Sequence, residues 1–136
     1  SPNSALQSII GSLSSGVFIM VKNKAGVWGE VFAARYLRDN GCRILTSNYV
    51  CRLGELDIVA SKGGKILFVE VKTRNVSTDI RPMEAVDAGK QSRLQAAAKS
   101  YMKSLGGDAV TRFDVCEVYL EDDMSLSRIN YIENAF

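Results

Sequence analysis

Histidine is absent from the 136 residues of this chain. Its absence excludes catalytic triads that use a histidine base, and every metal site that depends on imidazole ligands. Any catalysis must therefore rely on carboxylates, on lysines, or on a metal ion held by oxygen atoms.

Cysteine is scarce, and long apolar runs are missing. The three cysteines, Cys42, Cys51 and Cys116, are odd in number and show no CxxC spacing, which argues against a disulfide scaffold or a zinc knuckle. This usage is typical of a reducing compartment, so we expect a cytoplasmic protein. No run of eighteen apolar residues occurs, so we expect no membrane-spanning helix and no membrane partner.

Basic residues are rare at the C-terminal end of the chain. Residues 108–136 hold seven acids and only two bases, a net charge of −5. The remaining fifteen bases and eight acids give residues 1–107 a net charge of +7. A basic body with an acidic end suits a polyanionic partner bound on one side, although an ordinary mixed surface explains the charges equally well.

The first nineteen residues differ from the rest, because they contain no charged residue. We expect residues 1–19 to be an N-terminal extension, either disordered or artificial in origin. Met20 resembles a natural start, and residues 20–136 are long enough for a single domain with its own core.

The hydrophobic pattern predicts an α/β fold in the order α-β-β-β-α-β-β. The predicted elements are a helix at 25–39, strands at 43–49, 54–60 and 66–72, a loop at 73–83, a helix from Met83 or Asp87 to Ser104, and strands at 111–120 and 129–132. Both faces of residues 66–71 are apolar, which predicts a strand covered on both sides.

A hairpin turn at Gly63 and Gly64 fixes which residues face each other on two predicted strands. In this register Asp57 lies opposite Glu70, in a pair whose Cα atoms approach to roughly 4.5 Å. Like charges in that position are destabilising, so either a divalent cation lies between them or the pair splays into solvent.

Two further charged residues fall on predicted apolar helix faces. Glu30 lies on a stripe formed by Val27, Val31, Ala34 and Leu37. Lys90 lies on the stripe of the second helix. A buried carboxylate is costly unless it is paired or binds a metal, so Glu30 either joins a metal site or reaches solvent at the edge of the stripe.

Glu30, Asp57 and Glu70 therefore have reason to converge, with Lys72 on the same face of its strand as Glu70. Carboxylates that hold Mg²⁺ or Mn²⁺, with a lysine beside them, suit phosphodiester hydrolysis. The metal polarises the phosphate, and the lysine orients water or neutralises developing charge.

The spacing of these residues resembles a known superfamily. Asp57 followed by Glu70-Val71-Lys72 is similar to the D…(D/E)xK signature of PD-(D/E)xK nucleases, although Leu56 stands where a proline often precedes the aspartate. More of the chain, roughly 24–120, resembles the YraN-like family of small bacterial proteins, predicted nucleases related to archaeal Holliday junction resolvases. The matching segments are Gly29-Glu30, Ala33-Ala34, 54–60, 68–74, Ala85-Val86-Asp87, Lys90, Arg93-Leu94, Ala97-Ala98 and 112–115.

The resemblance implies a restriction-endonuclease-like core, a mixed β-sheet flanked by helices. It implies Asp57 and Glu70 as metal ligands, Glu30 as an accessory ligand and Lys72 as the catalytic lysine. It also implies that Lys90 and Arg93 face substrate phosphate.

Three residues have two compatible roles each. In the predicted register Glu55 faces Lys72, where an ion pair would position the lysine; a purely structural role is equally compatible. Arg74 and Arg81, in the predicted loop, are candidates for phosphate contacts or for a solvated loop.

We therefore predict a metal-dependent endonuclease acting on DNA, with branched DNA as a candidate substrate. The alternative is a catalytically silent nucleic-acid-binding module of a repair or processing complex. Resolving a junction needs two coordinated cuts, which makes a homodimer the candidate assembly.

Overall fold

The computed structural model describes residues 24–78 and 86–136. The predicted N-terminal extension at 1–19 and the candidate phosphate ligand Arg81 lie outside the described residues. The elements are α3 (Lys24–Asp39), β1 (Arg43–Cys51), β2 (Gly54–Lys62), β3 (Lys65–Asn75), α4 (Ala88–Leu105), β4 (Val110–Leu120) and β5 (Leu126–Ile132). Their order confirms the predicted α/β class and its α-β-β-β-α-β-β sequence.

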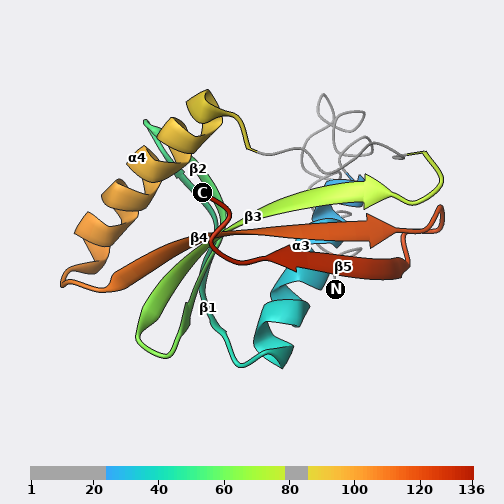
Figure 1. Ribbon diagram of the computed structural model, residues 1–136, viewed down its shortest axis with the longest axis horizontal. Helices are drawn as coiled ribbons and strands as arrows, with labels where there is room; N and C mark the ends of the chain where they lie inside the picture. Colours follow the sequence, from blue (N-terminus) through green and yellow to red (C-terminus); the bar gives the residue numbers. More distant parts are fainter. Residues whose placement is uncertain (1–23, 79–85) are drawn as a thin grey trace, which may run out of the picture.

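In the described part of the chain the strands form a mixed five-stranded sheet in the order β1-β2-β3-β4-β5. Strands β3 and β4 are parallel, and α4 connects them; the other neighbours are antiparallel. Figure 1 shows α3 and α4 on opposite faces of this sheet. The central strand β3 is thus covered on both sides, as its two apolar faces predict.

Each helix builds a core of its own against the sheet. Beneath α3 the buried residues are Phe32, Ala33, Leu37, Ile58, Ala60, Leu67, Val69, Cys116, Val118 and Leu120. Beneath α4 they are Leu56, Val59, Ile66, Phe68, Val86, Leu94, Ala97, Ala98, Tyr101 and Val115. Because residues of one strand alternate between faces, β3 and β4 contribute to both cores.

The hairpin between β2 and β3 has the predicted turn. Gly63 and Gly64 have φ angles of 55° and 78°, a region that glycine enters without the steric penalty of a side chain. The pairs run from Lys62 opposite Lys65 to Ile58 opposite Val69, which confirms the predicted register over this segment.

The structure corrects or narrows three local predictions. Strand β3 continues to Asn75, because its last residues pair with β4, so the predicted loop begins later than residue 73. Of the two predicted starts of the second helix, Asp87 is confirmed: its carboxylate caps α4 by accepting a 2.9 Å hydrogen bond from Lys90 N, and Met83 lies outside the described residues.

The third correction concerns the buried face of α3. It is formed by Gly29, Phe32, Ala33 and Leu37 rather than by Val27 and Val31. Small residues let the helix approach the sheet closely. A Cβ atom on Gly29 would lie 1.9 Å from Thr73 Oγ1, so glycine is required for this contact with β3.

Candidate active site

The site begins where β2 separates from β3. Their ladder ends at Ile58 and Val69, one residue before Asp57. The alternation of β2 also breaks there: Leu56 and Val59, three residues apart, both join the core under α4, whereas Ile58 joins the core under α3. Asn48, which faces this point from β1, has a φ of 54°. Strands β1 and β2, which form the outer hairpin, therefore both bend where Asn48 lies beside Asp57.

The kink places the Asp57 side chain in the fork between β2 and β3. Its Oδ2 accepts a 2.9 Å hydrogen bond from Val71 N, an amide that an unbroken ladder would pair with backbone. The regular pair of Asp57 with Glu70 is thus not formed, because the ladder ends first. The two carboxyl groups nevertheless meet in one hollow, where the charge of Glu70 acts on Asp57.

This meeting shifts the protonation of Asp57. Burial, followed by the charge of Glu70, raises the pKa of Asp57 to about 7, against a smaller opposing effect of the Val71 hydrogen bond. Glu70 itself is only 8% exposed. Two neighbouring carboxyl groups that resist ionising together attract a cation, and their oxygen atoms are of the type that binds divalent metal ions.

Glu30 approaches the same fork from α3. Its Oε2 accepts a 3.2 Å hydrogen bond from Asn48 Nδ2, so the kinked asparagine connects the helix to the fork. Burial, and to a lesser extent the charge of Glu70, raise the pKa of Glu30.

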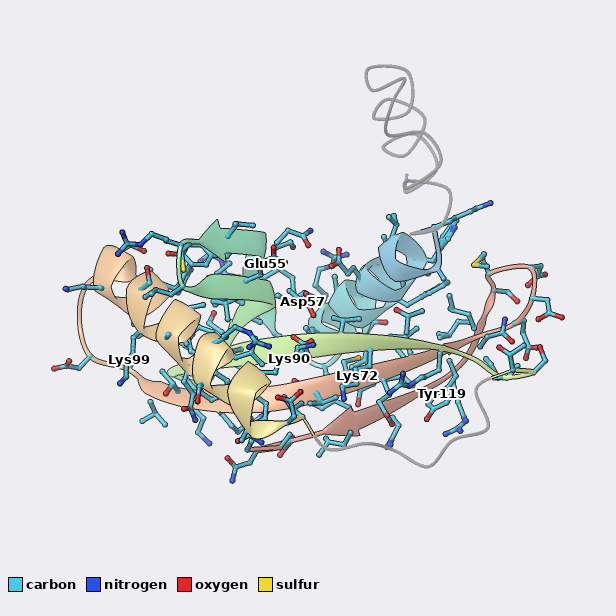
Figure 2. All side chains as sticks on the ribbon, turned by 90° about the horizontal axis from the view of Figure 1, so that it is seen from above. Glu55, Asp57, Lys72, Lys90, Lys99 and Tyr119 are labelled. Carbon is cyan, nitrogen blue, oxygen red and sulfur yellow. The ribbon has the colours of Figure 1, made fainter. Side chains whose placement is uncertain are left out.

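A lysine from α4 occupies the other side of Glu70. Lys90 Nζ lies 2.5 Å from Glu70 Oε1, and its side chain stays 42% exposed. Figure 2 shows Lys90 reaching from α4 toward the sheet near Asp57. The ammonium group contacts a carboxylate oxygen, so this side chain shows that the position favours positive charge.

Two hollows meet at Asp57. One, of about 360 Å³, is lined by Gly54, Glu55, Asp57, Glu70, Lys90, Arg93 and Leu94. The other, of about 430 Å³, is lined by Gly26, Val27, Glu30, Asn48, Glu55, Asp57, Val71 and Thr73. The shared residues Glu55 and Asp57 form the ridge between them.

The structure thus brings together most of the predicted site residues. Asp57, Glu70, Lys90 and Arg93 share the first hollow, and Glu30 joins Asp57 in the second. Within residues 24–78 and 86–136, no three carboxylate, cysteine or histidine side chains are arranged closely enough to hold a metal ion.

Two other predicted residues lie differently. Lys72 and Arg74 follow Glu70 along β3 and line neither of the two hollows. The expected cross-strand pair of Glu55 with Lys72 is not part of the β2–β3 ladder, which ends before it reaches these residues.

Sequence reasoning missed two residues that shape the site. Asn48 tolerates positive φ better than other non-glycine residues, which was the available signal for a kink. Gly54 lies where β2 passes α4, and a Cβ atom there would stand 2.9 Å from the carbonyl oxygen of Arg93. Gly54 has no side chain, and Asn48 has a low preference for strands. Both lie near the point where β2 separates from β3.

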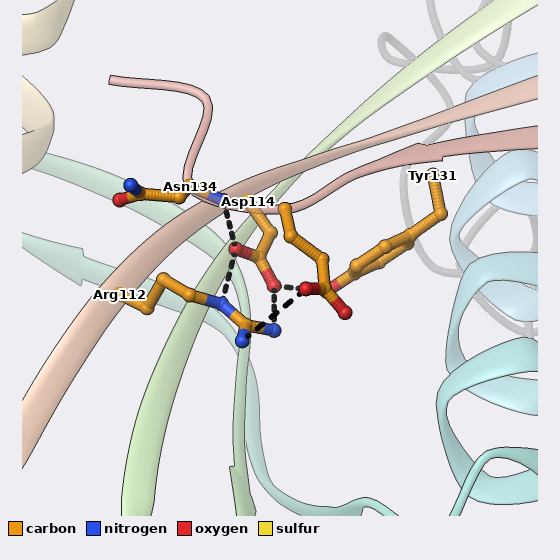
Figure 3. A network of polar contacts seen from close by, with 5 residues as sticks. Arg112, Asp114, Tyr131 and Asn134 are labelled. Atoms are coloured by element: carbon orange, nitrogen blue, oxygen red, sulfur yellow. Dashed lines mark hydrogen bonds and ion pairs between the residues drawn. The ribbon is translucent and has the colours of Figure 1, made fainter.

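It also missed a second cluster around a buried carboxylate (Figure 3). Asp114 is fully buried and accepts hydrogen bonds from Arg112 Nε and a terminal guanidinium nitrogen, each 2.8 Å, from Tyr131 Oη at 2.6 Å and from Asn134 N at 2.9 Å. Protein groups donate all of these hydrogen bonds, so the Asp114 carboxylate needs no added cation.

In the described part of the chain, no helix is both long enough and apolar enough to cross a membrane.

Comparison with known sequences points to one family. A family model described as "Uncharacterised protein family UPF0102" matches residues 29–118. A "UPF0102 protein" of Moorella thermoacetica is 42% identical over 118 residues, which cover 86% of this chain and 98% of that protein. One from Pelotomaculum thermopropionicum is 43% identical, covering 82% and 93%, and one from Syntrophomonas wolfei is 44% identical, covering 85% and 100%.

Proposed function

The chain belongs to the uncharacterised protein family UPF0102, and we propose that it is a metal-dependent endonuclease that hydrolyses DNA phosphodiester bonds. The observation that carries the proposal is the meeting of Asp57 and Glu70 in the fork between β2 and β3. Nothing in a structural role requires two carboxyl groups to meet there, and their mutual repulsion is costly.

The donor set fits Mg²⁺ or Mn²⁺. Oxygen ligands suit these ions, and Mg²⁺ is commonly bound by one or two carboxylates, with water and substrate phosphate completing its shell. Asp57 and Glu70 would hold the ion, and Glu30 would act as an accessory ligand through water. The bound ion would polarise the scissile phosphate and activate water for attack.

The basic residues around the first hollow would bind the substrate. Lys90, which pairs with Glu70, would be able to contact a phosphate oxygen instead if that carboxylate held a metal ion. Arg93, one turn further along α4, lines the same hollow and offers a planar donor fork that suits phosphate. Lys72 would orient the attacking water or neutralise charge that develops on the phosphate.

Arg74, two residues after Lys72 on β3, would contact the DNA backbone. Branched DNA is the substrate class we favour, with a homodimer supplying two cuts. The three cysteines described as free suit a reducing compartment, so we place this activity in the cytoplasm.

The test is cleavage of end-labelled linear, flapped and four-way DNAs by the purified protein with Mg²⁺ or Mn²⁺. Asp57→Ala and Lys72→Ala should abolish cleavage while circular dichroism and thermal unfolding show folded protein. Lys65→Ala, on the same strand but at its exposed start, and Lys99→Ala, on α4, are matched controls that should cut normally. Equal cutting by Asp57→Ala and the parent protein would remove the proposal.

A silent nucleic-acid-binding module is the second candidate. It is favoured by the ion pair of Lys90 with Glu70, which already neutralises one of the two carboxylates. Salt-dependent DNA binding that is unaffected by Mg²⁺, with no cleavage of any substrate in the panel, would select this candidate.

A further inference from the structure

The outer hairpin of β1 and β2 extends beyond the candidate active site. The ladder of β2 with β3 ends at Ile58, whereas β1 and β2 stay paired with each other as far as Cys51 and Gly54. Arg52 and Leu53 therefore form a two-residue turn. Such turns normally carry glycine, asparagine or aspartate, so the fold itself gives no reason for an arginine and a leucine there.

The end of this hairpin is apolar and exposed. Leu53 is 52% exposed, and Val50, just before the turn, is 67% exposed. Arg52, which lies between them in the chain, is also exposed. We call Val50, Arg52 and Leu53 the hairpin tip. Two apolar side chains beside a cation suit a partner that offers both an apolar surface and negative charge, as the bases and phosphates of DNA do.

Helix α4 holds the hairpin tip in place. Tyr49 packs edge-on against Tyr101, with ring centroids 5.3 Å apart, and its Oη lies 3.1 Å from Ser100 Oγ. Leu56, the ladder partner of Tyr49, is buried in the core under α4. The tip is therefore carried on a packed support, which a group that enters a stack of bases requires.

The hairpin tip lies beside the first hollow, the one lined by Asp57 and Glu70. Gly54, which follows the tip directly, and Glu55 belong to the same lining. Figure 2 shows Glu55 leading along β2 to Asp57. Four residues of extended chain separate Leu53 from Asp57, a distance of roughly 13 Å, which is about the length of four base-pair steps of DNA.

We propose that the hairpin tip is a wedge for the interrupted base stack of branched DNA, with Val50 and Leu53 against the bases and Arg52 on the adjacent phosphate. The inference rests on the proposed function, in which Asp57 and Glu70 act at the scissile phosphate. Separating bases in a continuous duplex is costly, whereas a branch point has already lost part of its stacking. An apolar wedge therefore selects branched DNA and places the cut about four nucleotides from the branch.

The first test needs no cleavage. Four-way DNA with the fluorescent base 2-aminopurine at the branch point is titrated with protein in EDTA, beside a linear duplex with the same label. The parent protein should raise the fluorescence of the branched DNA, because the labelled base leaves the stack. Leu53→Ser should remove this rise and lower the ratio of affinities for branched over linear DNA on the order of tenfold. Leu105→Ser, at the far end of α4 with 49% exposure, is the matched control and should change neither readout.

The other two residues of the tip give separate readouts. Val50→Ser should lower the same ratio by a smaller factor, and its matched control is Val110→Ser, at a valine 63% exposed at the start of β4. Arg52→Ala should weaken binding to both DNAs and reduce its salt dependence by about one phosphate contact. If Leu53→Ser does not fold, Leu53→Asn replaces it, since asparagine suits the turn.

The second test is cleavage of the same DNAs with Mg²⁺. Leu53→Ser should lower the ratio of cleavage rates for branched over linear DNA about tenfold. Fluorescence and selectivity like those of the parent in Leu53→Ser would overturn the wedge, even if the parent protein cuts DNA. If Leu53→Ser loses the fluorescence rise but the parent protein never cuts, the wedge stands and the proposed function fails. Binding of the parent protein to neither DNA would overturn both.

Discussion

Two clusters of carboxylates occupy this sheet, and they are built in opposite ways. Asp114 receives four hydrogen bonds, two of them from an arginine, and both of its oxygens are satisfied. Asp57 receives one hydrogen bond from the Val71 amide and otherwise faces Glu70, another carboxyl group. The first carboxylate is neutralised by an arginine of the protein; in the second cluster Lys90 pairs with Glu70, and no ion pair is formed by Asp57 with the residues that the structure describes.

The number of donors around a carboxylate distinguishes a structural acid from a candidate metal ligand more clearly than the burial of the side chain does. Asp114 is the more deeply buried of the two, yet its arginine stays charged: the hydrogen bonds and charge of Asp114 raise the pKa of Arg112 further above its usual range. At the fork, burial and like charge instead raise the pKa of Asp57. Sites for a cation are found where the protein leaves negative charge without enough donors.

The largest expected effect is loss of stability at the satisfied cluster. Asp114→Ala leaves the Arg112 guanidinium and the Tyr131 hydroxyl without their acceptor, so the free energy of unfolding should fall by about 3–5 kcal/mol. Chemical denaturation measures this change. Glu133→Ala removes an exposed acid 3.7 Å from the same arginine and should cost less than about 1 kcal/mol. Equal effects of the two substitutions would mean that Asp114 is no more important for stability than an exposed ion-pair partner of Arg112.

The next effect is on activity at the fork. Asp57→Asn keeps the shape of the side chain but removes the charge needed by a metal, so cleavage should fall at least about 10²- to 10³-fold. Stability in metal-free buffer should stay the same or rise, because a repulsion is removed. A strongly destabilised Asp57→Asn protein would place this residue in the same class as Asp114.

The sequence predicted that Asp57 and Glu70 lie near each other, but it predicted neither the fork in the ladder nor the cluster around Asp114. The turn at Gly63 and Gly64 determines the register of the hairpin, so the positions of Asp57 and Glu70 relative to each other follow from counting residues along each strand. The residues around Asp114 come from β4, β5 and the segment after β5, and their meeting depends on strand pairing between distant parts of the chain. No local pattern marks such contacts.

The same limit applies within the site. The approach of α4 to the fork, which gives Lys90 its ion pair with Glu70, depends on the packing of two cores. The predicted buried face of α3 was Val27, Val31, Ala34 and Leu37. Of these Leu37 is buried, whereas close packing placed Gly29 and Ala33 on that face instead of the two valines. Periodicity shows that a helix has an apolar face, but the fit to the sheet decides its rotation.

That fit gives a third, smaller prediction. Gly29→Ala places a methyl group against Thr73, so α3 must shift and the free energy of unfolding should fall by about 1–3 kcal/mol. Gly26→Ala is the matched control: it lies in the same helix with open space around it and should stabilise the protein by about 0.5–1 kcal/mol.

Gly29→Ala also tests whether the two clusters are independent. Because Glu30 follows Gly29 directly, cleavage should fall together with stability. The ¹H–¹⁵N signals of Arg112 and Asn134 should keep their chemical shifts, since these residues belong to the other cluster. Large shifts there would mean that α3 couples the two sites.

The smallest expected effect is the pH dependence of stability without metal. The pKa of Asp57 is about 7 in the folded protein, above the ordinary aspartate value of 3.8 that applies after unfolding. A raised acid pKa means that the folded state holds the proton more tightly, so this contribution to stability is complete below the unfolded value and is lost as the pH rises through about 7. Between pH 6 and pH 8 the free energy of unfolding should therefore fall by about 1 kcal/mol.

Asp57→Asn should remove this slope, whereas Glu133→Gln should retain it, when urea unfolding is followed at each pH. Added Mg²⁺ should offset the loss at pH 8 but have little effect at pH 6, because protons and the cation compete for the same oxygens. A slope that persists in Asp57→Asn would assign the titration to another group. If Mg²⁺ stabilised the protein equally at both pH values, the cation would bind somewhere other than the fork between β2 and β3.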